Sequence, residues 1–244
     1  MKKRRIFESA FSTYEVLEQL GEGGSGAVYA VEDGNGVVYA LKTLRPALVS
    51  TDKRKRLQNE IVFCMRHDHP NVIKVLDHGV CEHSPFYVME RFPLSLRQLM
   101  LIGLSGGDVL PLFSQMLDGI EAAHLLNVCH RDIKPENFLC NPQKNIVVAA
   151  DFGIARFTES ELHTLVETRP NDRLANFVYA APEQRVRKGQ ADQRTDIFSL
   201  GVILNEMFTD RVPQGAGYTK VADVSPNFAF VDEIIDAMIK HHPE

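Results

Sequence analysis

The residues most able to do chemistry lie in the run His130-Arg131-Asp132-Ile133-Lys134-Pro135-Glu136-Asn137. Asp132 can accept the proton of a Ser or Thr hydroxyl, and Lys134 can neutralise charge on a phosphoryl group in transfer. Asn137 can bind Mg²⁺ through its amide oxygen, and Asp151, which opens an Asp-Phe-Gly run, adds a hard carboxylate ligand. Each residue alone could be a helix cap or part of a turn. Their joint order and spacing favour phosphoryl transfer.

A glycine-rich segment upstream predicts a loop that approaches phosphate groups. Residues 21–28 fit the pattern G-x-G-x-x-G-x-V, in which glycine permits tight turns and close backbone approach. Strand-like residues continue from Ala27 to Glu32, which favours a flap over nucleotide phosphates over the dinucleotide motif, because that motif leads into a helix. An ordinary hairpin turn is the alternative. The candidate ATP-binding residues of this loop are Gly21, Glu22, Gly23, Gly24, Ser25, Gly26 and Val28.

Lys42 follows Tyr39, Ala40 and Leu41 in a predicted strand. A lysine at such a position is usually a solvated side chain, but beneath a glycine loop it can reach the α- and β-phosphates of a nucleotide. Glu60, within a helical stretch, is the candidate carboxylate that holds Lys42 in place. The alternative is that Glu60 is an ordinary solvent-facing residue.

The elements that must position these residues change character near residues 90–93. Before that point, β-rich runs and glycine turns dominate, with one helix expected over about 52–65. The predicted strands are 14–20, 27–32, 37–44, 72–77 and 86–90. Beyond Pro93 a 3.6-residue period predicts helices over 94–101, 110–126 and 195–208. We therefore expect an N-lobe over residues 1–91 and a C-lobe over residues 92–244.

Composition narrows the classes of protein that remain. The chain has 244 residues, 44% of them hydrophobic and 24% charged, with a formal net charge of -5. The negative balance argues against a nucleic-acid partner. The four cysteines form no C-x-x-C pair and no zinc spacing, so we expect free thiols in a reducing, cytoplasmic compartment. No apolar run approaches the roughly 18 residues of a membrane helix, so no membrane segment is expected in this chain.

Together these residues resemble the eukaryotic-type Ser/Thr protein kinase family over nearly the whole chain. The resemblance is carried by the glycine loop, the Ala-Leu-Lys ending at Lys42, Glu60, the His-Arg-Asp and Asp-Phe-Gly runs, and Ala181-Pro182-Glu183. It implies an α+β, two-lobed protein kinase fold, with an antiparallel N-lobe sheet plus one main helix and a mainly helical C-lobe. ATP would lie in the cleft. Lys134 favours Ser/Thr over Tyr as acceptor, and the run ending at Gln184 is similar to bacterial members.

The resemblance also assigns residues that composition and spacing do not single out. The expected adenine-binding set is the gatekeeper Met89, the hinge residues Glu90 and Phe92, and the apolar walls Val28, Ala40 and Leu139. The expected spine of stacked side chains includes Cys64, His130 and Phe152. Asp196 would anchor the catalytic loop from a buried helix.

Two departures from the family pattern stand out. Asn176 occupies the position of a threonine that usually bridges the catalytic aspartate and lysine, and its amide can make similar hydrogen bonds. The chain also stops before helices that normally supply an arginine partner for Glu183, so we expect a C-terminally truncated domain. Arg131 could read a phosphate on the activation loop, where Thr158, Ser160, Thr164 and Thr168 are candidates. We expect autophosphorylation at Thr164 or Thr168.

The expected activity is transfer of the γ-phosphoryl group of ATP to Ser or Thr hydroxyls of a protein, as part of signalling. The expected cofactor is Mg²⁺, with Mn²⁺ as an alternative metal, and a dimer would permit autophosphorylation in trans. Two other functions compete with this interpretation: a kinase of small molecules and a non-catalytic nucleotide-binding scaffold. The second is disfavoured because Lys42, Asp132, Asn137 and Asp151 are all present.

Overall fold

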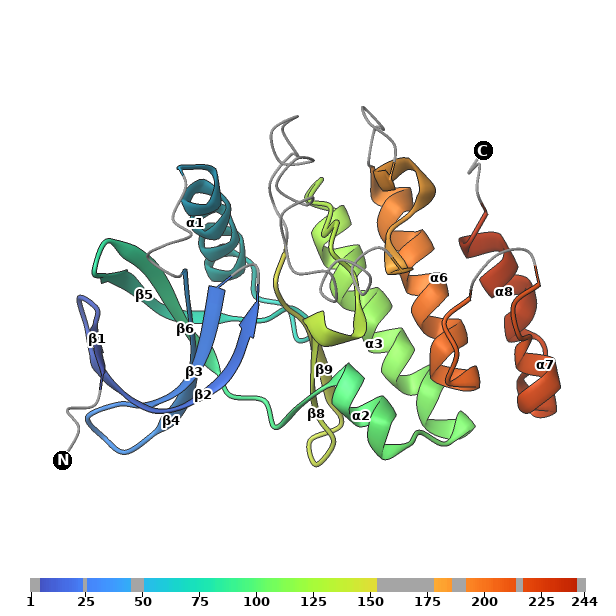
Figure 1. Cartoon of the computed structure of the whole chain (residues 1–244), viewed down its shortest axis with the longest axis horizontal. Helices are drawn as coiled ribbons and strands as arrows, with labels where there is room; N and C mark the ends of the chain where they lie inside the picture. The colour runs from blue at the N-terminus through green and yellow to red at the C-terminus, as the bar shows by residue number, and fades with distance from the viewer. Residues whose placement is uncertain are drawn as a thin grey trace. The chain divides into compact units, whose positions relative to one another are not determined.

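The chain forms two compact units, Met1–Phe92 (unit 1) and Pro93–Glu244 (unit 2), drawn in Figure 1 from a computed structural model. The structure describes residues 5–23, 26–44, 51–152, 178–185, 192–213 and 217–240, with the side chains of 51–53 and 56 excepted. In these ranges, unit 1 is an antiparallel sheet with one helix, and unit 2 is mainly helical, which confirms the predicted α+β kinase fold. Within these described ranges, no helix is both long and apolar enough to cross a membrane.

Unit 1 is built on a six-stranded antiparallel sheet with the order β1-β2-β3-β4-β6-β5. Its strands are β1 (Ile6–Glu8), β2 (Thr13–Gly23), β3 (Gly26–Glu32), β4 (Val38–Thr43), β5 (Val75–Cys81) and β6 (Ser84–Glu90). Helix α1 (Thr51–Arg66) packs against β5 and β6. The predicted strand over 72–77 was misplaced, because β5 begins at Val75 and continues to Cys81.

The short strand β1 was not predicted from the sequence. It pairs with β2 and also lies against β5, so the sheet is strongly curved. Phe7 at its centre is fully buried, and its ring meets Phe86 edge-on with centroids 5.2 Å apart. The rest of this core cluster comprises Tyr14, Val31, Leu41 and Val88.

The strand register decides which side chains share a face of this sheet. Val28 pairs with Lys42, and Lys42 pairs in turn with Tyr87. Two residues away on the same two strands, Ala40 pairs with Met89. Residues directly opposite each other in an antiparallel pair point to the same side, and residues two apart on one strand do too. All five side chains therefore share one face.

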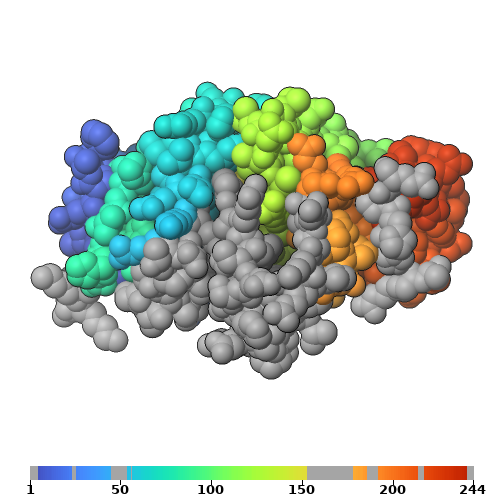
Figure 2. Space-filling view, turned by 90° about the horizontal axis from the view of Figure 1, so that it is seen from above, coloured from blue at the N-terminus to red at the C-terminus, as the bar shows by residue number. Residues whose placement is uncertain are grey.

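Unit 2 is organised around the buried helix α6 (Gln193–Thr209). The other helices in the described part of unit 2 are α2 (Leu96–Ile102), α3 (Gly106–His124), α7 (Val221–Val224) and α8 (Val231–Met238). Helix α6 contacts α3 on one side and α8 on the other, and Figure 2 shows α3, α6 and α8 in this order. The predicted helices over 94–101, 110–126 and 195–208 correspond to α2, α3 and α6, with boundaries shifted by up to four residues. Capping explains part of that shift, since Ser105 and Asp108 form a capping box that starts α3.

Unit 2 also contains a small sheet and short 3-10 turns. Strands β7 (Leu94–Ser95), β8 (Phe138–Asn141) and β9 (Ile146–Ala149) pair in the order β7-β8-β9. The 3-10 turns are η2 (Pro135–Asn137), η3 (Pro182–Arg185) and η4 (Pro226–Phe228). The hairpin of β8 and β9 is the element that carries the metal-ligand candidates described below.

Candidate active site

The ion pair expected in unit 1 is present. Lys42 Nζ lies 3.2 Å from Glu60 Oε1 and 3.4 Å from Glu60 Oε2, and both side chains are almost fully buried. Glu60 reaches Lys42 from α1, which covers this face of the sheet. A buried charge is costly without a partner, so each residue of this pair offsets the cost of burying the other. The role of the pair in nucleotide binding remains a prediction.

The predicted adenine wall of unit 1 lies on the same face as Lys42. Ala40 and Met89 are buried cross-strand partners, and Val28 is half-buried beside them. Glu90 at the end of β6 is exposed, and Phe92 is half-buried. The structure thus brings an apolar surface and a buried ammonium group together on one sheet face, which suits an aromatic base followed by phosphates.

The glycine-rich segment is described in part. Gly21, Glu22 and Gly23 end β2 and pair across the hairpin with the first residues of β3. Gly26 has φ +134°, and a Cβ there would lie 2.2 Å from the carbonyl oxygen of Thr43. Packing against β4 therefore already requires glycine at this position. Gly21 and Gly23 have open space where a Cβ would lie, so no steric contact explains them.

In unit 2, Asp196 holds the backbone of the catalytic loop. Its carboxylate accepts hydrogen bonds from the backbone N–H groups of His130 and Arg131, both at 2.8 Å, and lies 2.8 Å from His124 Nε2. Asp196 is fully buried on α6. Arg131 has φ 65°, a costly conformation for a non-glycine residue, which these bonds help to maintain. The anchoring contact expected of Asp196 is confirmed.

The candidate base Asp132 lies at the centre of the loop with its carboxylate held on one side. Asn137 Nδ2 donates to the Asp132 backbone carbonyl at 2.7 Å and to Asp132 Oδ2 at 3.0 Å. Lys134 Nζ also lies 3.0 Å from Oδ2, and 43% of the Asp132 side chain is exposed. The carboxylate is therefore oriented by residues of its own loop and remains accessible to solvent. A base that receives a substrate hydroxyl needs both properties.

The two metal-ligand candidates lie at the same end of the β8–β9 hairpin. Phe138 pairs with Ala149 at the end of the hairpin, and just beyond this pair Ala150 N donates to Asn137 O at 2.8 Å. Asn137 therefore forms one end of this last backbone contact, and Asp151 directly follows the other end. Asp151 has φ 60° and is half-buried. The Asn137 amide nitrogen is used for Asp132, which leaves its oxygen as the natural ligand atom. A carboxylate plus an amide oxygen is a hard donor set that fits Mg²⁺ completed by phosphate oxygens.

Within the described part of the chain, no larger metal cage competes with this pair. The described residues contain no group of three or more His, Cys, Asp or Glu side chains that could hold a metal ion. The rings of His130 and Phe152 are in contact, with centroids 4.7 Å apart and planes tilted by 38°, and His130 Nε2 lies 3.0 Å from Ala150 O. Cys64, the other predicted spine residue, is fully buried in unit 1, and Leu139 is half-buried on β8.

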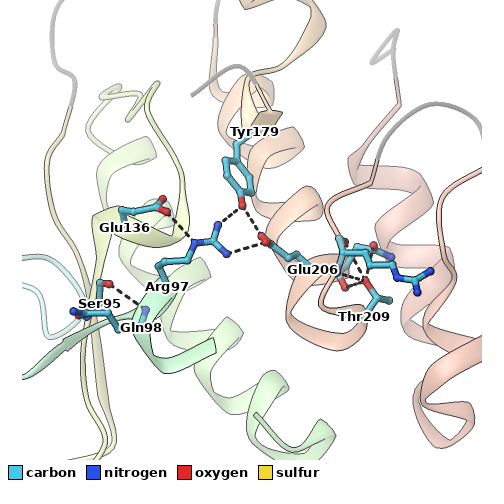
Figure 3. A network of polar contacts seen from close by, with 9 residues as sticks. Ser95, Arg97, Gln98, Glu136, Tyr179, Glu206 and Thr209 are labelled. Carbon is cyan, nitrogen blue, oxygen red and sulfur yellow. Dashed lines mark hydrogen bonds and ion pairs between the residues drawn. The ribbon is translucent and has the colours of Figure 1, made fainter. Parts of the chain in front are cut away.

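A polar network that the sequence did not predict joins α2, the catalytic loop and α6 (Figure 3). Arg97 donates to Glu136 at 2.9 Å, to Glu206 at 2.8 Å and to the Tyr179 hydroxyl, and Tyr179 donates to Glu206 at 2.6 Å. Burial and the bond to Glu206 raise the pKa of Tyr179 above its usual range. Ser199 Oγ donates to Tyr179 O at 2.8 Å. This network fixes the backbone that enters the Ala-Pro-Glu segment.

Glu183 has a partner that the sequence did not suggest. Thr195 Oγ1, at the start of α6, donates to Glu183 Oε1 at 3.0 Å. Next to it, Gln184 Nε2 donates to the carbonyl oxygen of Arg131 at 2.9 Å. The Ala-Pro-Glu segment is thus tied both to α6 and to the catalytic loop. Several residues singled out in the sequence lie outside the described ranges: Gly24, Ser25, Gly153, Thr158, Ser160, Thr164, Thr168 and Asn176.

The sheet-and-helix unit 1 and the loop geometry of unit 2 together define a phosphotransfer domain of the kinase class. The protein kinase domain family matches residues 14–237, and the chain belongs to this family. The chain is 35% identical to serine/threonine-protein kinase pkn3 of Myxococcus xanthus, over 82% of this chain and 38% of that protein. It is 32% identical to serine/threonine-protein kinase PrkC of Bacillus subtilis, over 82% of this chain and 31% of that protein. The chain therefore spans about a third of the length of these relatives.

Among solved structures, the kinase domain of PknI from Mycobacterium tuberculosis is similar to this chain with a TM-score of 0.73. That match has 25% sequence identity and covers 100% of this chain and 92% of the other. Strand β1, at residues 6–8, lies outside the part of the chain that the family covers.

Proposed function

We propose that this chain transfers the γ-phosphoryl group of ATP to Ser or Thr hydroxyls of protein substrates. The observation that carries the proposal is the catalytic loop. Asp132 presents an accessible carboxylate that is oriented by Asn137 and Lys134, on a backbone anchored by Asp196. The names of the relatives support Ser/Thr as the acceptor.

In this proposal, unit 1 supplies the residues that bind ATP. Val28, Ala40 and Met89 contact the adenine ring, with Glu90 and Phe92 beside it. Leu139 of unit 2 adds a further apolar contact. Lys42, held by Glu60, donates to the α- and β-phosphates. The glycine-rich residues 21–26 cover the phosphates, and their backbone N–H groups donate to phosphate oxygens.

Unit 2 supplies the residues that transfer the phosphoryl group. Asp132 accepts the proton of the incoming hydroxyl, and Lys134 neutralises charge on the transferring group. Asn137 and Asp151 would hold a divalent cation, which we propose is Mg²⁺, with Mn²⁺ as the alternative. When bound, that cation would neutralise phosphate charge and orient the β- and γ-phosphates. The loop backbone, which Asp196 holds by two hydrogen bonds, keeps the Asp132 carboxylate in place during the proton transfer.

The test is transfer of label from γ-labelled ATP to a generic Ser/Thr protein substrate in the presence of Mg²⁺. Asp132→Asn is the informative variant, and Asp118→Asn, an exposed residue on α3, is the matched control. We expect label with the wild type and with Asp118→Asn, and a loss of at least about a hundredfold with Asp132→Asn. Transfer to sugars or aminoglycosides but not to protein would refute the protein-substrate assignment.

Regulation by autophosphorylation is part of the proposal. Thr164 and Thr168 are the preferred sites, and a transient dimer would allow one chain to modify another. Intact mass and peptide mapping after incubation with ATP would test this, and unmodified loop peptides alongside substrate turnover would refute it. We also propose a cytoplasmic location, which is supported by four free cysteines: Cys64, Cys81, Cys129 and Cys140.

A further inference from the structure

A buried tyrosine touches the Lys42–Glu60 pair. Tyr87 is fully buried on β6, directly opposite Lys42 on β4. Its hydroxyl donates to Glu60 Oε1 at 2.9 Å, the same oxygen that lies 3.2 Å from Lys42 Nζ. Its ring centroid lies 5.7 Å from Lys42 Nζ. Tyr87 therefore contacts both members of the pair through two different parts of its side chain.

The Glu60 carboxylate is contacted by two different kinds of donor, the Lys42 ammonium group and the Tyr87 hydroxyl. An ammonium group has three N–H donors. A lysine that binds phosphates must direct some of these donors to phosphate oxygens, so not all of them can go to one carboxylate. The Tyr87 hydroxyl is a neutral donor, so it can orient Glu60 without competing for the phosphates. Because the site is buried, a hydrogen bond to this charged oxygen is stronger than it would be in water.

We propose that Tyr87 is a positioning residue that fixes the Glu60 carboxylate so that Lys42 is directed to the phosphates of ATP. This inference rests on the proposed function and deepens it. Its competitor is a purely structural role, in which the hydroxyl takes Glu60 as a convenient acceptor and the ring fills the core. The two roles differ in what they predict for ligands with and without phosphate groups.

Tyr87→Phe is the informative variant, because it keeps the ring and its contact with Lys42 and deletes only the hydroxyl. Tyr39→Phe is the matched control. Tyr39 lies on the same strand as Lys42 but points to the opposite face of the sheet, where its ring meets Tyr14 at 6.2 Å. Circular dichroism and thermal melting of each variant confirm that it is folded before binding is compared.

The first measurement is calorimetric binding of ATP·Mg²⁺ and of adenosine, which has no phosphate. We expect Tyr87→Phe to weaken ATP·Mg²⁺ binding about tenfold, which is the lower end of the range for the loss of one hydrogen bond to a charged group. Adenosine binding should stay within about twofold of wild type, and Tyr39→Phe should change neither. Equal weakening of both ligands, or no change in either, would overturn the positioning role.

The second measurement is a double-mutant cycle on kcat/KM for ATP. Tyr87→Phe should lower this ratio about tenfold in the wild type and less than about twofold in the Glu60→Gln background, while KM for the protein substrate is unchanged. The same loss in both backgrounds would show that Tyr87 does not act through Glu60. If the wild type binds ATP·Mg²⁺ but transfers no phosphate, the proposed function fails while the binding comparison still decides the role of Tyr87. A wild type that binds no ATP would overturn both.

Discussion

Replacing Asp196 with alanine should be far more damaging than an average buried substitution. The carboxylate is fully buried and accepts the N–H groups of His130 and Arg131 at 2.8 Å, in addition to its contact with His124. Alanine leaves one buried and one partly buried backbone donor without their acceptor, and each such donor costs about 1–3 kcal/mol. The constraint that keeps Arg131 at φ 65° is lost as well, so the loop can relax away from the geometry that orients Asp132.

The two unpaired donors together cost about 2–6 kcal/mol, a large part of the roughly 5–15 kcal/mol that stabilises a typical domain. Urea unfolding followed by circular dichroism measures this loss, and labelled-phosphate transfer measures the loss of activity in samples that remain folded. Asp210→Asn is the matched control, because Asp210 caps the other end of α6 at φ 55° and asparagine tolerates that conformation well. A loss below about 1 kcal/mol for Asp196→Ala, or full activity in the folded variant, would refute the anchoring argument.

Three other parts of the structure give further predictions. Phe7→Ala should destabilise unit 1 by about 3–5 kcal/mol, because it empties a fully buried ring site, and an unchanged melting temperature would contradict this. Glu206→Leu should cost about 3–5 kcal/mol in urea unfolding, because it leaves Arg97 and Tyr179 without a shared buried acceptor; a cost below about 1 kcal/mol would show that the two donors find water instead. Burial raises the pKa of Cys140 to about 12, so at about pH 8 iodoacetamide should leave it unmodified in the native state and label it only after unfolding, as peptide mass spectrometry would show.

Local patterns in the sequence predicted the parts of the site whose residues are close together in the chain. The loop from His130 to Asn137 needs no long-range information, since Asp132, Lys134 and Asn137 contact one another within a few residues. The family resemblance added the more distant partner Asp196. Helices with a clear apolar period, such as α3 and α6, were also predicted, with errors at their ends where caps decide the boundary.

The features that were missed depend on contacts between distant residues or on very short elements. Strand β1 has three residues, too few to show an alternating pattern, and it is held by packing of Phe7 against strands far along the chain. Arg97 and Glu206 are separated by 109 positions, and no spacing rule connects them. In the sequence, nothing distinguishes Tyr87 from the apolar residues around it in the strand. Its hydroxyl contacts Glu60 only after α1 has packed on the sheet, so the contact cannot be predicted from local patterns.

Burial divides the charged groups of the site into two kinds, and the division has a physical reason. Glu60 and Asp196 are almost fully enclosed, and each uses its charge on groups of this chain: an ammonium and a tyrosine hydroxyl in unit 1, backbone N–H groups in unit 2. A buried carboxylate that lacked such partners would be protonated or would destabilise the fold, so its full set of contacts makes it rigid. Asp132 is contacted by Asn137 and Lys134 at its Oδ2 atom and keeps 43% of its side chain exposed. A rigid, enclosed charge cannot meet a substrate, whereas a half-exposed charge on a rigid support can, and this difference supports the proposal that Asp132 is the reactive carboxylate of the loop.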